Sequence, residues 1–154
     1  MTTRATVDAF LAQRRLAFAG VSRNPLDFSR SLFREFRRRG YDAVPVNPQV
    51  AEIDGIPCYP AISAIPQPVE AAILLTRADV TDGVVEDCAR AGVRQIWLYR
   101  AGGSGAVTPA AERFCREHEI AVVAGECPFM FFPDTGWFHR LHGCWRKLRG
   151  RYPN

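Results

Sequence analysis

Residues 16–25 read Leu-Ala-Phe-Ala-Gly-Val-Ser-Arg-Asn-Pro, a short apolar run that reaches a glycine and then passes into a loop. An uninterrupted apolar run of this length indicates a strand that is buried on both faces, as in parallel sheets. Residues 28–36 follow with phenylalanine and leucine at helical spacing, and Gly40 stands where a glycine would close the helix. A buried strand followed by an amphipathic helix predicts a β-α-β unit.

The same alternation continues along the chain. Strands are predicted at residues 16–21, 41–48, 71–75, 93–99 and 120–124, and helices at 6–15, 28–39, 80–91 and 108–118. We therefore predict an α/β fold, a Rossmann-like, doubly wound parallel sheet of about five strands in a single domain, with strand order 3-2-1-4-5. Pro45 lacks an N–H group, so we expect it near a sheet edge or a gap in pairing. Ligands of such sheets bind beyond the carboxyl ends of the strands, beside the first strand.

The composition is that of a globular protein. The 154 residues are 47% hydrophobic and carry 20 basic and 16 acidic side chains, which excludes disorder, collagen and coiled coil. No apolar run is long enough to cross a membrane, and the N-terminus does not resemble a signal peptide. The five cysteines are odd in number and lack a C-x-x-C motif, so we expect reduced thiols and a cytoplasmic location.

The loop after the first strand has the chemistry of an anion site. Gly20 permits a tight turn, Ser22 and Arg23 offer a hydroxyl and a positive charge, and the next helix offers free N–H groups. A dinucleotide fingerprint would need glycine in place of Ser22 and Pro25. It would also need an acidic residue in place of Asn47. These departures disfavour a standard NAD site, but they are compatible with another adenosine ligand that carries phosphate.

Several short motifs, spread over about residues 15–128, together resemble the bacterial CoA-binding domain family. That family is similar to the N-terminal CoA-binding domain of the succinyl-CoA synthetase alpha subunit. The motifs are Gly20-x-Ser22-x-x-Pro25, Gly40-Tyr41, Pro45-Val46-Asn47-Pro48, Gly55, Tyr59-Pro60, Ile65-Pro66 and Gly92-Val93-x-x-Ile96-Trp97. The chain departs from the family at residues 100–105, where Gln-x-Gly is usual, and we interpret this glycine-rich loop as a connection or a lid.

The resemblance implies binding of coenzyme A or an acyl-CoA, with no committed catalytic activity. It places the pyrophosphate on the first loop, the adenosine 3′-phosphate and ribose beside Asn47 and Pro48, and the pantetheine or adenine beside residues 75–80. The residues implicated are Gly20, Val21, Ser22, Arg23, Pro25, Ser29, Asn47, Pro48, Leu75, Thr76, Arg77 and Val80. We expect Gly20→Val to block the ligand and to leave the fold largely intact.

No catalytic group and no metal site is predicted. The run His139-x-x-His142-x-Cys144 does not match a common zinc spacing, and Glu86 and Asp87 are interpreted as solvated helix residues. Cys127 follows the last strand, and we interpret it as a packed cysteine. The less favoured alternative is that its thiol meets the thiol of CoA at the ligand mouth. The alternative function is a small oxidoreductase or transferase that uses an adenine nucleotide such as NAD(P).

The C-terminal segment differs from the rest of the chain. Residues 1–128 are predicted to form the CoA-binding domain, and residues 129–154 an aromatic and basic extension that packs on it. Residues 135–154 hold five basic side chains and no acidic one. The segment could form a homodimer contact, and contact with lipid or nucleic acid is the less favoured alternative.

Overall fold

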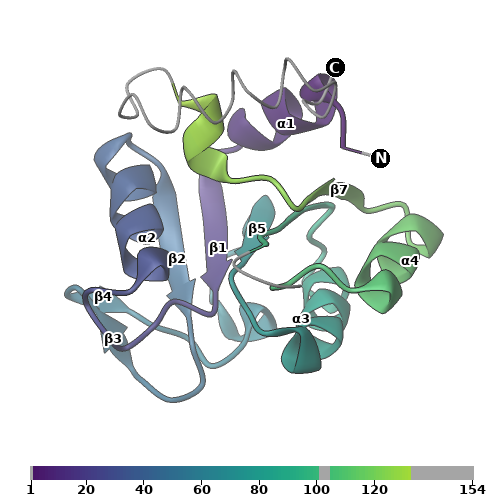
Figure 1. Ribbon diagram of the computed structural model, residues 1–154. Helices are drawn as coiled ribbons and strands as arrows, with labels where there is room; N and C mark the ends of the chain where they lie inside the picture. The colour runs from purple at the N-terminus through teal and green to yellow at the C-terminus, as the bar shows by residue number, and fades with distance from the viewer. Residues whose placement is uncertain (1, 101–104, 133–154) are drawn as a thin grey trace.

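The computed structural model describes residues 2–100 and 105–132 and has one five-stranded parallel sheet between two helical layers (Figure 1). The sheet consists of β1 (Arg15–Ala19), β2 (Asp42–Val46), β5 (Ala71–Leu74), β6 (Gln95–Leu98) and β7 (Ala121–Ala124). The helices are α1 (Arg4–Leu11), α2 (Phe28–Arg38), α3 (Ala78–Arg90) and α4 (Pro109–Glu117). The predicted α/β, Rossmann-like class is confirmed.

The strand order differs from the prediction. The sheet runs β2-β1-β5-β6-β7, which is 2-1-3-4-5 for the parallel strands and not 3-2-1-4-5. Pro45 lies in β2, and the expected edge position of this proline is confirmed. Pro45 cannot donate a backbone hydrogen bond, so β2 is suited to the edge of the sheet and pairs with β1 alone among the strands of this sheet. The fully buried β5 pairs with the other side of β1. The switch point of the sheet therefore lies between β1 and β5.

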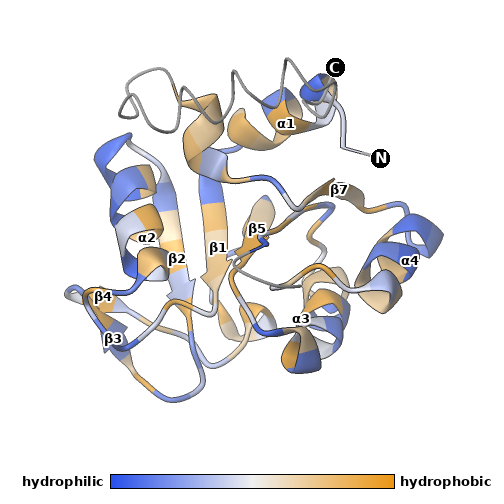
Figure 2. Ribbon diagram, in the orientation of Figure 1, coloured by the Kyte–Doolittle hydropathy of each residue, from blue (hydrophilic) through white to orange (hydrophobic). Residues whose placement is uncertain are grey.

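Each face of the sheet has its own apolar core. One face packs against α1 and α2, where Phe18 meets the rings of Phe33 and Phe36 with centroids 5.6 and 5.1 Å away. The other face packs against α3 and α4. Figure 2 shows the strands mostly in the colour of hydrophobic residues, whereas the helices alternate between hydrophobic and hydrophilic. This pattern explains why the strands read as continuous apolar runs and the helices as periodic ones.

The proline-rich stretch after β2 contains a hairpin that we did not predict. β3 (Glu52–Ile53) and β4 (Ile56–Pro57) pair antiparallel around Asp54 and Gly55, whose φ angles are +51° and +75°. An Asp-Gly pair with two positive φ angles is the usual two-residue hairpin turn. A 3₁₀ turn (Ile62–Ala64) follows the hairpin.

The described part of the chain ends in a second 3₁₀ turn (Pro128–Phe131), after which Phe132 is buried against the α2 core. The predicted roles of residues 133–154, including His139, His142 and Cys144, concern positions outside the described residues. Cys58, Cys88 and Cys115 are free and buried, and Cys127 is free and half-buried. Among the residues that are described, no helix is long and apolar enough to span a membrane, and no cluster could hold a metal ion.

Candidate functional site

A cavity of about 450 Å³ opens at the carboxyl edge of the sheet, beside the switch point. Its floor is the end of β1 and β2, and its walls come from the turn after β2, the segment before the 3₁₀ turn, and α3. The lining residues are Ala19, Gly20, Val46, Asn47, Pro48, Gln49, Pro60, Ala61, Ile62, Thr76, Gly83, Val84, Asp87 and Arg90. The cavity is a mostly apolar slot with a few polar groups, which is typical of a small-molecule site.

Gly20 is needed by the fold itself. Its φ is +90°, and a Cβ atom there would lie 2.9 Å from the carbonyl carbon of Leu75. The ends of β1 and β5 therefore approach each other so closely that only glycine fits. The expectation that Gly20→Val leaves the fold largely intact is wrong, because the side chain would collide with backbone.

Thr76 presents a hydrogen-bond acceptor to the cavity. Its Oγ1 lies 2.7 Å from Oγ1 of Thr81, and Thr81 Oγ1 donates to the carbonyl of Arg77 at 2.9 Å. A hydroxyl group has one hydrogen, so Thr76 must be the donor to Thr81. The lone pairs left on Thr76 Oγ1 can accept a hydrogen bond from a ligand amino or hydroxyl group.

Asn47 fastens the turn after β2 to the first loop. Its Nδ2 donates to the carbonyl of Val21 at 2.9 Å, and its Oδ1 accepts from the N–H of Gln49 at 2.8 Å. One amide hydrogen of Nδ2 stays available for a ligand. Asn47 therefore mainly holds the turn and the first loop together. Because its side chain is neutral, it adds no negative charge to this rim of the cavity.

Asp87 is buried and braces the opposite wall. Its Oδ2 accepts from the N–H groups of Ile62 (2.7 Å) and Ser63 (3.2 Å), and its Oδ1 accepts from Arg90 (3.3 Å). Burial raises the pKa of this carboxyl, but the bonds from Ser63 and Ile62 and the charge of Arg90 outweigh it, so the pKa lies below its usual value. The interpretation of Asp87 as a solvated helix residue is wrong, whereas Glu86 is exposed as expected.

The first loop directs its polar groups inward. The N–H of Ser22 donates to Ser29 Oγ at 2.9 Å, and the N–H of Asn24 donates to Ser22 Oγ at 3.1 Å. At the start of α2, the N–H of Ser29 donates to Oδ1 of Asp27 at 2.8 Å. The N–H groups expected to be free at this helix end are therefore partly satisfied, and the carboxylate of Asp27 occupies the place of an anion.

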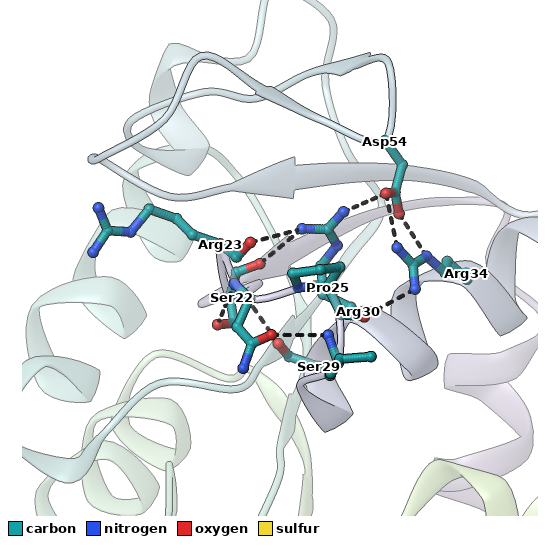
Figure 3. Close-up of polar contacts among 9 residues, drawn as sticks. Ser22, Arg23, Pro25, Ser29, Arg30, Arg34 and Asp54 are labelled. Atoms are coloured by element: carbon teal, nitrogen blue, oxygen red, sulfur yellow. Dashed lines mark hydrogen bonds and ion pairs between the residues drawn. The ribbon is translucent and has the colours of Figure 1, made fainter.

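Two arginines of α2 hold the same loop from behind (Figure 3). Arg30 donates to the carbonyl groups of Ser22 and Arg23 at 3.2 and 3.3 Å, and Arg34 donates to that of Pro25 at 3.0 Å. Both arginines are paired with Asp54 at the hairpin tip. The hydrogen bond from Arg34 and the charge of Arg30 lower the pKa of Asp54 to about 2. The side chain of Arg23 is exposed and points away from this network.

The structure brings together only part of the predicted set. Gly20, Asn47, Pro48 and Thr76 line the cavity. Ser22, Pro25 and Ser29 belong to the loop network, Val21 is buried, and Leu75, Arg77 and Val80 lie beside the end of β5 without lining the cavity. Most of the residues we missed belong to α3 and to Pro60–Ile62, and the others are Ala19, Val46 and Gln49. One signal was available, because Gly83 lies in the middle of a helix, where glycine is unfavourable unless something approaches closely.

Cys127 agrees with the favoured interpretation of a packed cysteine and not with the alternative of a reactive thiol. It is absent from the cavity lining, and burial raises the pKa of its thiol. Its charge would also disfavour ionisation of Tyr99, whose pKa is raised to about 12 mainly by burial. A thiolate poised for exchange with a CoA thiol is therefore not supported at this position.

A protein family described as "CoA binding domain" matches residues 14–133. The match covers the ends of β1 and β2 and all the residues that line the cavity. The chain belongs to this family. The CoA-binding resemblance predicted from the motifs is thereby confirmed.

Relatives of this CoA-binding domain include much longer proteins. It is 30% identical over 109 residues to ADP-forming acetate–CoA ligase I of Archaeoglobus fulgidus, covering 71% of the chain and 16% of the ligase. It is 24% identical to the uncharacterized protein YneT of Bacillus subtilis, covering 74% of the chain and 82% of YneT. The chain spans about a fifth or less of the length of the first curated relatives that it matches.

Solved structures agree on the fold. A hypothetical protein from Pyrococcus horikoshii OT3 superimposes with a TM-score of 0.75 at 24% identity, covering 83% of this domain and 87% of that chain. A dinucleotide forming acetyl-coenzyme A synthetase 1 of Ca. Korarchaeum cryptofilum gives a TM-score of 0.63 at 26% identity, covering 72% of this domain and 26% of that chain. The fold therefore occurs both as a small protein and as part of a synthetase.

Proposed function

We propose that this CoA-binding domain holds coenzyme A or an acyl-CoA in the cavity at the carboxyl edge of its sheet, and that it binds without catalysis of its own. The observation that carries the proposal is the position of the cavity, at the switch point and within the span that matches the family. Its volume of about 450 Å³ is in the range of small-molecule sites.

The lining of the cavity supports binding of the adenosine part of the ligand there. Apolar side chains such as Val46, Ile62 and Val84 form walls for a planar base, and Thr76 Oγ1 is an acceptor for a donor group on the base or sugar. A Cβ atom on Gly83 would meet nothing within 4 Å, so the glycine leaves open space at the α3 wall. Arg23 is the exposed cation of the first loop and is the residue that we assign to the pyrophosphate.

A binding role also agrees with the state of the carboxylate in the cavity. Asp87 is held by two N–H groups and an arginine, so its oxygens are engaged in structure. The activities named for the relatives belong to far longer proteins, of which this chain spans about a fifth or less. A cytoplasmic location and a homodimer contact through residues 129–154 stay predictions.

The proposal is tested by thermal unfolding and calorimetric titration with CoA, acetyl-CoA, NAD, NADP and ATP. We expect CoA to stabilise the protein by about 2.7 kcal/mol at a hundredfold excess over Kd. Gly83→Leu should abolish that shift by filling the slot while the helix itself gains propensity. Ala5→Leu, an exposed alanine of α1, is the matched control and should respond like the wild type. No response to CoA, or a stronger one to NAD or NADP, would refute the proposal and favour the nucleotide-dependent enzyme.

A further inference from the structure

Two charged side chains line the cavity, and both come from α3 (Ala78–Arg90). Asp87 lies on the buried side of the helix and Arg90 on its last turn, where the Arg90 side chain is 64% exposed. The other lining residues are neutral. The charge that a ligand meets in this cavity is therefore decided by this one pair.

The two partners differ in how far they are already engaged. The carboxylate of Asp87 accepts two backbone N–H bonds besides its contact with Arg90. A guanidinium has five N–H donors, and a single bond from Arg90 Nη2 to Asp87 at 3.3 Å is found among the described residues. Asp87 thus anchors one edge of the guanidinium, and the remaining donors are available to an anion.

The opposite rim of the cavity is uncharged. In sheets of this type, the ribose of an adenine nucleotide lies beside the end of the second strand, where an acidic residue binds its hydroxyl groups. Here Asn47, Pro48 and Gln49 stand at that place. Arg90 lines the same cavity, and an arginine that replaces the acidic residue is the arrangement that accommodates a phosphate on the ribose.

We propose that Arg90 is a specificity-determining residue that binds a phosphomonoester on the ribose of the bound adenosine ligand. The inference rests on the proposed function, because it assumes that the adenosine occupies this cavity. A ribose phosphomonoester occurs at the 3′ position in CoA and at the 2′ position in NADP. Arginine suits this group because its planar fork pairs with two phosphate oxygens at once.

The test compares ligands that differ only in this phosphate. Calorimetric Kd values are measured for CoA and dephospho-CoA, and for NADP and NAD, on the full chain. We expect the wild type to bind CoA at least about tenfold more tightly than dephospho-CoA, since a charge-assisted hydrogen bond contributes about that factor.

Variants assign the preference to one side chain. Arg90→Ala should lower the affinity for CoA to that for dephospho-CoA and leave the affinity for dephospho-CoA unchanged, and Arg90→Lys should restore part of the preference. Arg94→Ala removes an exposed arginine that does not line the cavity and should keep the wild-type ratio. Thermal unfolding of each variant verifies that the fold is retained.

The outcomes separate this inference from the function on which it rests. If CoA and dephospho-CoA bind equally well, or if Arg90→Ala weakens both by the same factor, Arg90 does not recognise the phosphate although CoA binding stands. If an Arg90-dependent preference appears only between NADP and NAD, the role of Arg90 is supported and the CoA proposal fails. If none of the four ligands binds, both proposals fall.

Discussion

The first loop and the rim formed by α3 border the same edge of the sheet, yet they use their polar groups in opposite ways. In the loop, the groups of Ser22, Asn24 and Ser29 bond to one another, and arginines hold three of its carbonyl oxygens. At the rim, Arg90 of α3 and Thr76, which precedes the helix, keep hydrogen-bonding capacity toward the cavity. The polar groups of the loop with the sequence signature are thus mainly engaged in scaffold, whereas the proposal for Arg90 places part of the recognition on a helix without a motif.

The largest expected effect comes from Gly20, where the scaffold is tightest. Gly20→Ala combines a positive φ with a collision against the backbone of Leu75, so we expect a loss of about 3 kcal/mol in the free energy of unfolding. Gly40 has a similar φ of +88° with nothing within 4 Å of its Cβ position. Gly40→Ala therefore isolates the backbone cost and should lose about 1 kcal/mol. Urea unfolding measures both, and equal losses would contradict the close approach.

The next effect concerns the ion pairs that Arg30 and Arg34 form with Asp54 behind the first loop. Asp54→Asn leaves the Arg30 side chain, only 9% exposed, without its counterion. Breaking a fully buried pair costs about 3 to 5 kcal/mol, and we expect about 2 kcal/mol here because Asp54 is partly exposed. Since the arginines also hold the loop carbonyls, CoA affinity should fall as well. Glu52→Gln, an exposed strand residue of the same hairpin, is the control and should change neither quantity.

At low pH, the free energies of unfolding of the wild type and of Asp54→Asn should become similar. The pKa of Asp54 is lowered in the folded protein from 3.8 to about 2, so the folded state favours the ionised carboxylate. Its contribution is complete above the unfolded pKa and is lost as the pH falls from about 4 toward 2. Urea unfolding across this range should show the two stabilities converging. A gap that persists undiminished at pH 2 would show that the ion pairs are not its cause.

Much of this architecture follows from local rules. The buried run before Gly20 and the helix after Thr108 were predicted correctly. In the structure, Oγ1 of Thr108 caps this helix by accepting from the N–H of Ala111 at 2.9 Å. The strand order was predicted wrongly. Pro45 already indicated that its strand lies at an edge, so a third strand could not pair beyond it. The Asp54-Gly55 turn was also present in the sequence and was overlooked.

Part of the cavity lining was predicted, at the positions that topology alone determines. Gly20, Asn47 and Thr76 follow three neighbouring strands, so they had to meet at one edge. The α3 wall depends on how the helix is rotated against the sheet, and an isolated sequence does not fix that rotation. Asp87 shows the difficulty, because a carboxylate in a helix suggests solvent unless the N–H groups that bind it, from Ile62 and Ser63, are known.

The smallest expected effect tests whether the first loop contacts the ligand at all. Asp27 places a carboxylate at the start of α2, where a pyrophosphate would otherwise profit from the helix dipole. Asp27→Asn keeps an equally good cap, because an amide oxygen accepts from Ser29 as well. We expect stability to fall by less than about 1 kcal/mol, and CoA to bind about two- to fivefold more tightly at low salt.

The measurement for Asp27→Asn is a calorimetric Kd for CoA at two salt concentrations. The gain should shrink at high salt, because exposed charges are screened over about 10 Å at 0.1 M ionic strength. Asp79→Asn, an exposed carboxylate in the first turn of α3, is the matched control for a helix N-terminus that is not assigned to the pyrophosphate. If both variants gain equally, the effect is one of net charge. If only Asp27→Asn gains, the pyrophosphate lies at the first loop, and the loop is a scaffold that also touches the ligand.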